Sequence, residues 1–177
     1  MADVVRIRLA RDTDLDAVME VIGDGKRAIA ELDIDQWQDG YPDAAAVRAD
    51  IERGACYIAI DGSGRPLGTL ALLFGADTDY ETAGIPWLNT RYPYAAIHRC
   101  AVATGAGGHG VMSGMFSRAL AIARAHGSGS VRCDTHPDNI RMRGFLAKQG
   151  FTELGEFNLV SHGGGSDSRR IAYEKPL

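Results

Sequence analysis

The N-terminal third of the chain predicts a short strand followed by two helices. Apolar and polar residues alternate over residues 4–9, as in a strand with one buried face. Thr13 is the expected N-cap of the first helix, whose apolar residues recur at helical spacing: Leu15, Val18, Met19 and Ile22. The stretch WQDGYPD predicts a turn, after which Asp43 caps a second helix that runs to about Glu52.

The middle of the chain predicts a hairpin and then an irregular segment. Strands are expected over residues 56–60 and 66–74, because the apolar runs CYIAI and PLGTLALLF flank the turn DGSG. Residues 75–92 have no clear period and contain Gly, Pro, Asn and Asp, which is typical of a loop.

The C-terminal half predicts strands that alternate with helices. A strand over residues 93–102 leads into the glycine-rich stretch GAGGHGVMSG and a helix to about Ala125. The run SVRCDT predicts another strand, and a helix is expected from residues 137–139 through RMRGFLAKQ. Two last strands, FTELGEFNLV and RRIAYEK, form a hairpin around the flexible tip HGGGSDS. This order of elements predicts a single mixed α/β domain over residues 1–177.

The composition is that of an ordinary folded domain. The chain has 177 residues, of which 45% are hydrophobic and 24% charged, so it can bury a core and carries no signature of disorder. The formal net charge is −4, which gives no reason to expect nucleic acid or an anionic membrane as a partner.

The cysteines and the N-terminus indicate a cytoplasmic protein. The three cysteines are far apart in the sequence and form no CxxC pair, which argues against a disulfide framework and against a zinc site. The start MADVVRIRL has charged residues and no long apolar core, so no signal peptide is expected. The most apolar run, LGTLALLFGA, is too short to span a membrane.

The glycine-rich stretch at residues 105–114 predicts an anion-binding loop, because a turn between a strand and a helix N-terminus presents free backbone amides. A Walker loop is excluded, since Val111 stands where its lysine belongs. A dinucleotide-binding fingerprint can be placed on Gly105, Gly107 and Gly110, but the antiparallel hairpins expected before it make the match poor.

A third interpretation covers most of the chain. The order of elements and the segments DIDQWQDGYP, YAAIHRCAVA, NIRMRGFLAKQGF and RIAYEKPL resemble those of the GCN5-related N-acetyltransferases, the GNAT family. The resemblance implies a central, mostly antiparallel sheet with a splayed strand pair, flanked by helices. It also implies an N-acetyltransferase that moves an acetyl group from acetyl-CoA, as co-substrate, to a primary amine by direct attack. No metal is expected, because His98 and Cys100 are too few ligands without a second pair.

The resemblance also implies where acetyl-CoA binds. The splayed strand of the family binds the pantetheine arm and is represented by Cys100, Ala101 and Val102, while Asn139 matches a family asparagine that contacts the same arm. The loop and the first helical turn would hold the phosphates through backbone amides, at Gly107, Gly108, His109, Gly110, Val111, Met112 and Ser113.

The sequence departs from the family pattern at three positions. Counted from Ala101 and the DTHPDN segment, Gly107 replaces the usual arginine or glutamine, and Met112 replaces a glycine or alanine. An alternative register on Gly108 and Gly110 moves the following helix out of phase. Leu146 stands where many members have a tyrosine that acts as general acid. These departures favour weaker cofactor binding, with His109 as a substitute phosphate donor.

The residues near these motifs suggest the groups for acetyl transfer. His98 or His136 could be the general base, because each lies on a strand beside the expected cleft, and either could instead be a packed structural histidine. Asp134 could orient a histidine, bind the substrate amine or cap the chain. Trp37 and Tyr41 are expected on the acceptor side, together with four carboxylates that suit a cationic amine: Glu31, Asp33, Asp35 and Asp39.

Two functions remain open at this stage. The first is an active N-acetyltransferase with a small amine, a peptide N-terminus or a lysine side chain as acceptor. The second is a weak or inactive relative that binds an acyl-CoA or another ligand as a sensor or interaction module. Exposed strand edges also allow a homodimer.

Overall fold

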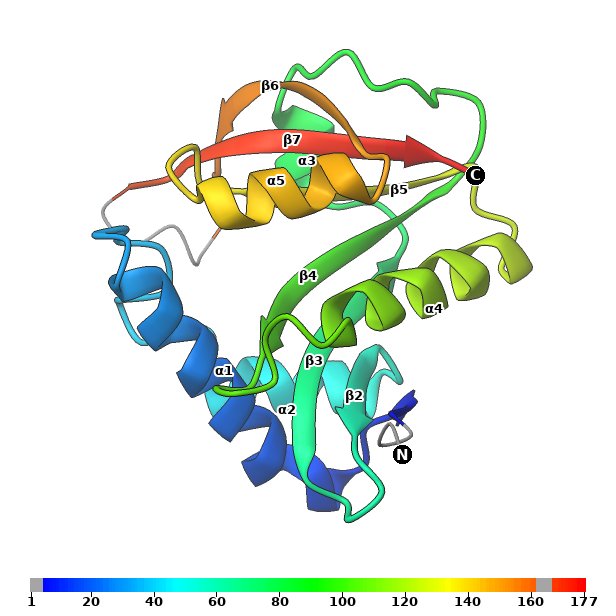
Figure 1. Cartoon of the computed structure of the whole chain (residues 1–177). Coiled ribbons are helices and arrows are strands. Elements are labelled where there is room, and N and C mark those ends of the chain that lie inside the picture. Colours follow the sequence, from blue (N-terminus) through cyan, green and yellow to red (C-terminus); the bar gives the residue numbers. More distant parts are fainter. Residues whose placement is uncertain (1–4, 162–166) are drawn as a thin grey trace.

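Seven strands form one mixed sheet in the order β1-β2-β3-β4-β5-β7-β6 (Figure 1). The computed structural model describes residues 5–161 and 167–177. All neighbouring strands are antiparallel except β4 and β5, which are parallel. The strands are β1 (Arg6–Leu9), β2 (Cys56–Ile60), β3 (Pro66–Phe74), β4 (Tyr94–Val102), β5 (Ser130–Thr135), β6 (Thr152–Asn158) and β7 (Arg169–Pro176).

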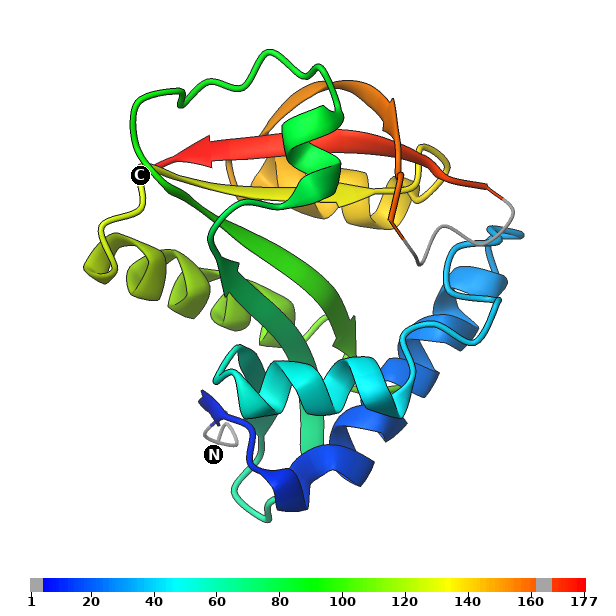
Figure 2. The same ribbon diagram turned by 180° about the vertical axis from the view of Figure 1, so that it is seen from behind.

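Helices cover both faces of this sheet. One face carries α4 (Val111–Ala125) and α5 (Ile140–Lys148), whose apolar residues share a core with β3, β4 and β5. The opposite face, seen in Figure 2, carries α1 (Leu15–Ala30), α2 (Ala44–Glu52) and the short α3 (Thr78–Thr82). The alternation of side chains along the strands produces this division, since consecutive residues such as Ile58 and Ala59 belong to opposite cores.

The sequence predicts most of these elements within a few residues. The expected hairpin of β2 and β3 is confirmed, and so is the cap of α2, where the Asp43 carboxylate accepts the Ala46 amide at 2.8 Å. The expected loop over residues 75–92 contains α3, capped by Asp77, which accepts the amides of Asp79 and Tyr80. Of the expected tip HGGGSDS, residues 162–166 lie outside the described residues.

Thr13 is not the N-cap of the first helix. A single 3-10 turn (Asp12–Asp14) comes first, and α1 begins at Leu15. The Asp14 carboxylate instead accepts the Arg11 amide at 2.7 Å and two bonds from the Arg8 guanidinium. These contacts with Arg8, on β1, fix the start of the helix, and no local sequence pattern contains them.

The predicted splayed strand pair is present. β4 and β5 pair only from Tyr94 to Ala96, opposite Ser130 to Arg132, and then diverge (Figure 1). β4 also contains a bulge, because His98 pairs with Ala71 and Ala101 pairs with Thr69, which leaves two residues of β4 opposite one of β3. Arg99, in this bulge, has a left-handed backbone with φ of 49°. The bulge and the divergence together open the sheet at its centre.

Candidate active site

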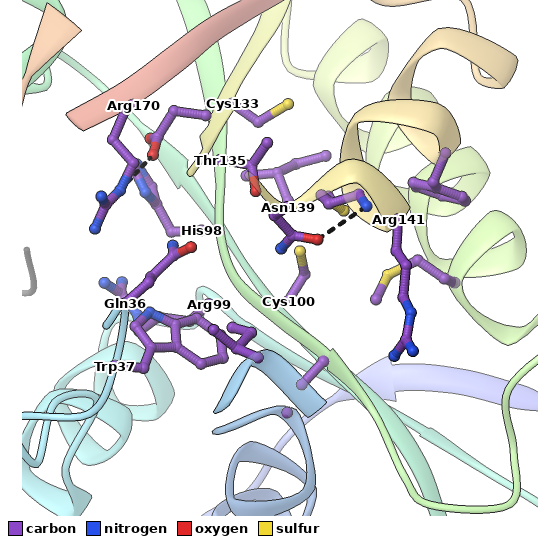
Figure 3. Close-up of a pocket in the computed structure, with 18 of the residues that line it drawn as sticks. Gln36, Trp37, His98, Arg99, Cys100, Cys133, Thr135, Asn139, Arg141 and Arg170 are labelled. Atoms are coloured by element: carbon purple, nitrogen blue, oxygen red, sulfur yellow. Dashed lines mark hydrogen bonds and ion pairs between the residues drawn. The ribbon is translucent and has the colours of Figure 1, made fainter. Parts of the chain in front are cut away.

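A cavity of about 700 Å³ lies where β4 and β5 diverge. Its walls come from α1, the segment of residues 36–41, the start of α3, the middle of β4, the end of β5 and the first turn of α5. Gly107 and Gly108 of the glycine-rich loop close one end. Residues that are distant in the sequence therefore meet around one space (Figure 3).

The glycine-rich loop has the geometry that an anion-binding loop needs. Gly105, Gly108 and Gly110 have φ between 77° and 82°, which explains why glycine is favoured there. Gly110 is the N-cap of α4, whose first amides have no acceptor within the helix. The loop is fixed to α1, because the Thr104 amide donates to the Asp24 carboxylate at 2.6 Å.

Not all of the loop residues named from the sequence reach the cavity. Gly107, Gly108 and Met112 line it, whereas the remaining four do not: His109, Gly110, Val111 and Ser113. The Val111 side chain is 4% exposed and packs in the core, so only its backbone amide is available to a ligand. A side chain at Gly107 would meet nothing within 4 Å, so the position of the usual arginine or glutamine is open.

The strand and helix residues expected to contact the cofactor arm do line the cavity. The part of β4 beyond the last residue paired with β5 contains Cys100, Ala101 and Val102. Their backbone groups therefore form no hydrogen bonds with β5. Burial raises the pKa of the Cys100 thiol to about 12, which keeps it neutral near pH 7. Asn139 caps α5 by accepting the Met142 amide at 3.1 Å, and Figure 3 shows its amide nitrogen turned toward the cavity.

At the position of the family tyrosine, this chain has a core residue, Leu146. Leu146 is fully buried against α4 and the sheet, while its neighbour Phe145 lines the cavity instead. A leucine has no proton to donate, so this position supplies no general acid.

His98 is placed as a base would need to be. Its ring lines the cavity, and Nε2 lies 2.9 Å from Asp77 Oδ2, close enough for an ion pair although not aligned as a hydrogen bond. Tyr80 stacks on the ring with a centroid distance of 5.6 Å. Burial disfavours the charged form of Asp77, but His98 and the backbone amides of Tyr80 and Asp79 together outweigh burial and lower the pKa of the carboxyl.

Asp134 also lines the cavity, but its carboxylate already has partners. Tyr80 donates its hydroxyl to Oδ2 at 2.7 Å, and Arg170 Nε lies 3.5 Å from Oδ1. Burial raises the pKa of Asp134, and the same burial together with this carboxylate raises the pKa of Tyr80 well above its usual value. The pair therefore holds α3 against β5 beneath His98.

The structure corrects the expectation for His136. Its side chain is 3% exposed and is not part of the cavity wall. Nδ1 accepts the Asp138 amide at 3.1 Å, and Nε2 lies 3.0 Å from Asp167 Oδ2. Both ring nitrogens are thus engaged in holding the end of β5 to the start of β7, so His136 has no free lone pair for a substrate proton.

The two aromatic residues expected on the acceptor side are part of the cavity wall. Trp37 and Tyr41 both line the cavity, and the Tyr41 hydroxyl accepts a bond of 2.7 Å from Arg99. The four carboxylates expected beside them do not line it: Glu31, Asp33, Asp35 and Asp39. The acidic residues that line the cavity are instead Asp134 and two residues of the segment that the sequence predicts as a loop, Asp77 and Asp79.

The sequence model of the acetyltransferase (GNAT) family matches residues 26–151. The chain belongs to the GNAT acetyltransferase family. A solved GNAT acetyltransferase from Streptococcus agalactiae 2603 is 30% identical, with a TM-score of 0.83 over 98% of this chain and 95% of that one. No curated protein sequence matches the chain.

More distant solved structures share the GNAT fold. A GNAT acetyltransferase from Listeria monocytogenes 4b F2365 is 19% identical, with a TM-score of 0.72 over 98% of this chain and 95% of that one. A NatC complex solved with Gag peptide and CoA contains a chain that is 13% identical, with a TM-score of 0.71 over 98% of both chains.

Three residues of this GNAT cavity are not singled out by the sequence. Asp77 lies in a segment without periodicity, and its contact with His98 depends on how α3 folds onto β4. Gln36 belongs to the quoted segment DIDQWQDGYP, in which the neighbouring tryptophan is the more obvious residue. Arg141 follows Asn139 by two positions at the start of α5, which is the one signal that places it near the loop.

The described residues, 5–161 and 167–177, contain neither a cluster of metal ligands nor a membrane-spanning helix. No group of three or more His, Cys, Asp or Glu side chains in these ranges is arranged to hold a metal ion. No helix within the same ranges has the length and the apolar character needed to cross a bilayer.

Proposed function

We propose that this GNAT protein is an N-acetyltransferase that moves the acetyl group of acetyl-CoA to a primary amine. The observation that carries the proposal is the single cavity that joins a helix-terminal glycine loop, the unpaired side of β4 and the His98–Asp77 pair. The glycine loop suits a pyrophosphate, and the unpaired side of β4 suits a pantetheine arm. The His98–Asp77 pair suits the deprotonation of an amine.

The loop end of the cavity fits coenzyme A. Backbone amides at Gly107, Gly108 and the first turn of α4 would hold the phosphates, since they are free of helical partners and lie at the positive end of the helix dipole. Arg141 supplies the positive charge that is absent from the loop itself. Asn139 and the backbone of β4 would bind the pantetheine arm between α5 and the sheet.

His98 is the proposed general base. A neutral amine attacks the thioester carbonyl carbon, the carbon–sulfur bond breaks, and the nitrogen loses one proton, which His98 accepts. Asp77 Oδ2, 2.9 Å from His98 Nε2, would orient the ring. Val102 is proposed to polarise the carbonyl through its backbone N–H, and the departing thiolate takes a proton from solvent because Leu146 has none to give.

A calorimetric titration with acetyl-CoA followed by a thiol-release assay tests this proposal. We expect acetyl-CoA to bind and a primary amine to release free CoA. His98→Gln should lower kcat by about 10²–10⁴-fold with little change in acetyl-CoA affinity. The matched control is His126→Gln, because His126 is exposed and stacks on Phe74 away from the cavity.

Two results would contradict the proposal. Absence of acetyl-CoA binding at millimolar concentration would exclude both the enzyme and the acyl-CoA sensor. Tight binding without turnover on any amine would instead favour the sensor, to which Met112 and Leu146 point.

A further inference from the structure

Gln36 has a buried polar atom without a partner in the wall of the cavity. The side chain is 9% exposed, and its Oε1 accepts no hydrogen bond from the residues that the structure describes. Figure 3 shows the carboxamide pointing into the cavity, above Trp37 and below His98. Buried polar groups are nearly always hydrogen-bonded, so an unpaired oxygen facing a cavity indicates that a ligand supplies the donor.

The backbone position of Gln36 is fixed by the turn that carries it. Trp37, the next residue, has a left-handed backbone with φ of 66°, which a non-glycine residue adopts at a cost. The Gln38 side chain donates to the Gln36 carbonyl at 3.0 Å and to the Lys26 carbonyl at 3.2 Å. Lys26 in turn donates to the Gly40 carbonyl at 2.9 Å. The turn is therefore anchored to α1, and these bonds hold the Gln36 backbone at the cavity wall.

The groups around Gln36 favour a cationic ligand. Arg99 is engaged by Asp50 and Tyr41, and Arg170 lies beside Asp134, so neither guanidinium is left to bind an anion. Asp77 adds a negative charge on the far side of His98. The rest of this wall is apolar or aromatic and comes from α1 and the turn: Ile29, Leu32, Trp37 and Tyr41.

We infer that Gln36 Oε1 accepts an N–H of the acceptor amine and holds the nitrogen next to His98. The inference rests on the proposed acetyl transfer and adds the class of acceptor: a primary amine whose body is apolar or aromatic. An amine of this kind pairs its polar end with Gln36 and packs its carbon skeleton against Trp37. Gln36 thus determines the affinity for the acceptor amine, whereas the affinity for acetyl-CoA does not depend on Gln36.

The test uses 2-phenylethylamine as acceptor and compares two variants of Gln36. Gln36→Met keeps the length of the side chain but removes the acceptor oxygen, while Gln36→Glu keeps an acceptor at the same place. We expect the methionine variant to raise the KM for the amine by about tenfold or more and to leave the KM for acetyl-CoA unchanged. The glutamate variant should stay within about threefold of the wild type for the amine.

A second measurement separates this inference from the proposed function. The amine is titrated calorimetrically into wild-type and Gln36→Met protein saturated with CoA, and Tm is recorded for both. Weaker amine binding at an unchanged or higher Tm supports the inference even if the wild type does not turn over, because a purely structural role would lower Tm. Equal amine affinity in the two proteins overturns it, and so does a wild type that binds no amine.

Discussion

Arg99 donates from Nε and Nη2 to the two carboxylate oxygens of Asp50, at 2.6 and 2.9 Å. These bonds connect the bulge of β4 to α2, and the third nitrogen, Nη1, reaches the Tyr41 hydroxyl at 2.7 Å. Asp50 is 3% exposed, so the Arg99 guanidinium replaces water as the hydrogen-bond donor to its carboxylate. The pair keeps the left-handed backbone of Arg99 in place, and with it the unpaired side of β4 that faces the cavity.

Removal of Asp50 should destabilise the fold and weaken acetyl-CoA binding together. In Asp50→Ala the Arg99 guanidinium is left buried without its anion, which costs about 3–5 kcal/mol of unfolding free energy. Urea unfolding and calorimetry with acetyl-CoA measure the two effects. Arg53→Ala is the control, because Arg53 lies 3.9 Å from the same carboxylate but is 55% exposed, and its loss should cost little. A stable Asp50→Ala protein with unchanged acetyl-CoA affinity would contradict the role given to the pair.

Two glycines of α1 should respond to alanine in opposite ways. A Cβ at Gly25 would lie 2.8 Å from the Ala101 Cβ and 3.2 Å from Trp37 Cζ3, whereas at Gly23 its nearest neighbour is the flexible end of Arg27 at 3.6 Å. Gly23→Ala should therefore gain up to about 1 kcal/mol from helix propensity. Gly25→Ala should lose about 1–3 kcal/mol, since α1 must move away from β4.

The Gly25→Ala variant should also weaken acetyl-CoA binding, because Ala101 belongs to the segment proposed to hold the pantetheine arm. Denaturant unfolding gives the two stabilities, and titration with acetyl-CoA gives the affinities. Equal stability of the two alanine variants would show that α1 and β4 can separate without cost.

Most of the fold could be predicted because it rests on local patterns. Two apolar runs on either side of a turn give β2 and β3, the 3.6-residue period gives α1, and Asp43 is a capping residue immediately before α2. The glycine loop is visible for the same reason, since its left-handed residues must be glycine wherever the chain folds this way.

The candidate site was predicted less well because it depends on tertiary contacts. His98 lies within one expected strand and His136 directly follows another, and only the contacts of His136 with Asp138 and Asp167 reveal that it is structural. Asp77, the partner of His98, lies in a segment that has no periodicity. Gln36 cannot be recognised from the sequence, because its unpaired oxygen exists only once the turn packs against α1.

Alkylation of Cys100 should be slow and should keep rising with pH. Iodoacetamide reacts with the thiolate, and burial raises the pKa of this thiol to about 12, so little thiolate forms below pH 10. We expect a rate at pH 8 at least about tenfold below that of free cysteine, without a plateau before pH 10. Peptide mass spectrometry follows Cys100 separately from the buried Cys56 and Cys133. Saturating acetyl-CoA should slow the labelling further, and a plateau near pH 9 would contradict the burial of this sulfur.

Arg141 should contribute to acetyl-CoA affinity in a salt-dependent way. Its side chain is 65% exposed and lines the cavity beside Asn139. Because its Nη1 is as far as 4.0 Å from Glu31 Oε2, the guanidinium is free to turn toward a phosphate. Arg141→Ala should raise the Kd for acetyl-CoA by about three- to tenfold at low salt, and the difference should shrink in 0.5 M NaCl because exposed charges are screened. Arg118→Ala is the control, since it removes the same charge from an exposed position of α4 that does not line the cavity. An equal loss of affinity in both variants would mean that net charge acts rather than a contact, and no loss in either would leave the phosphates to the backbone amides alone.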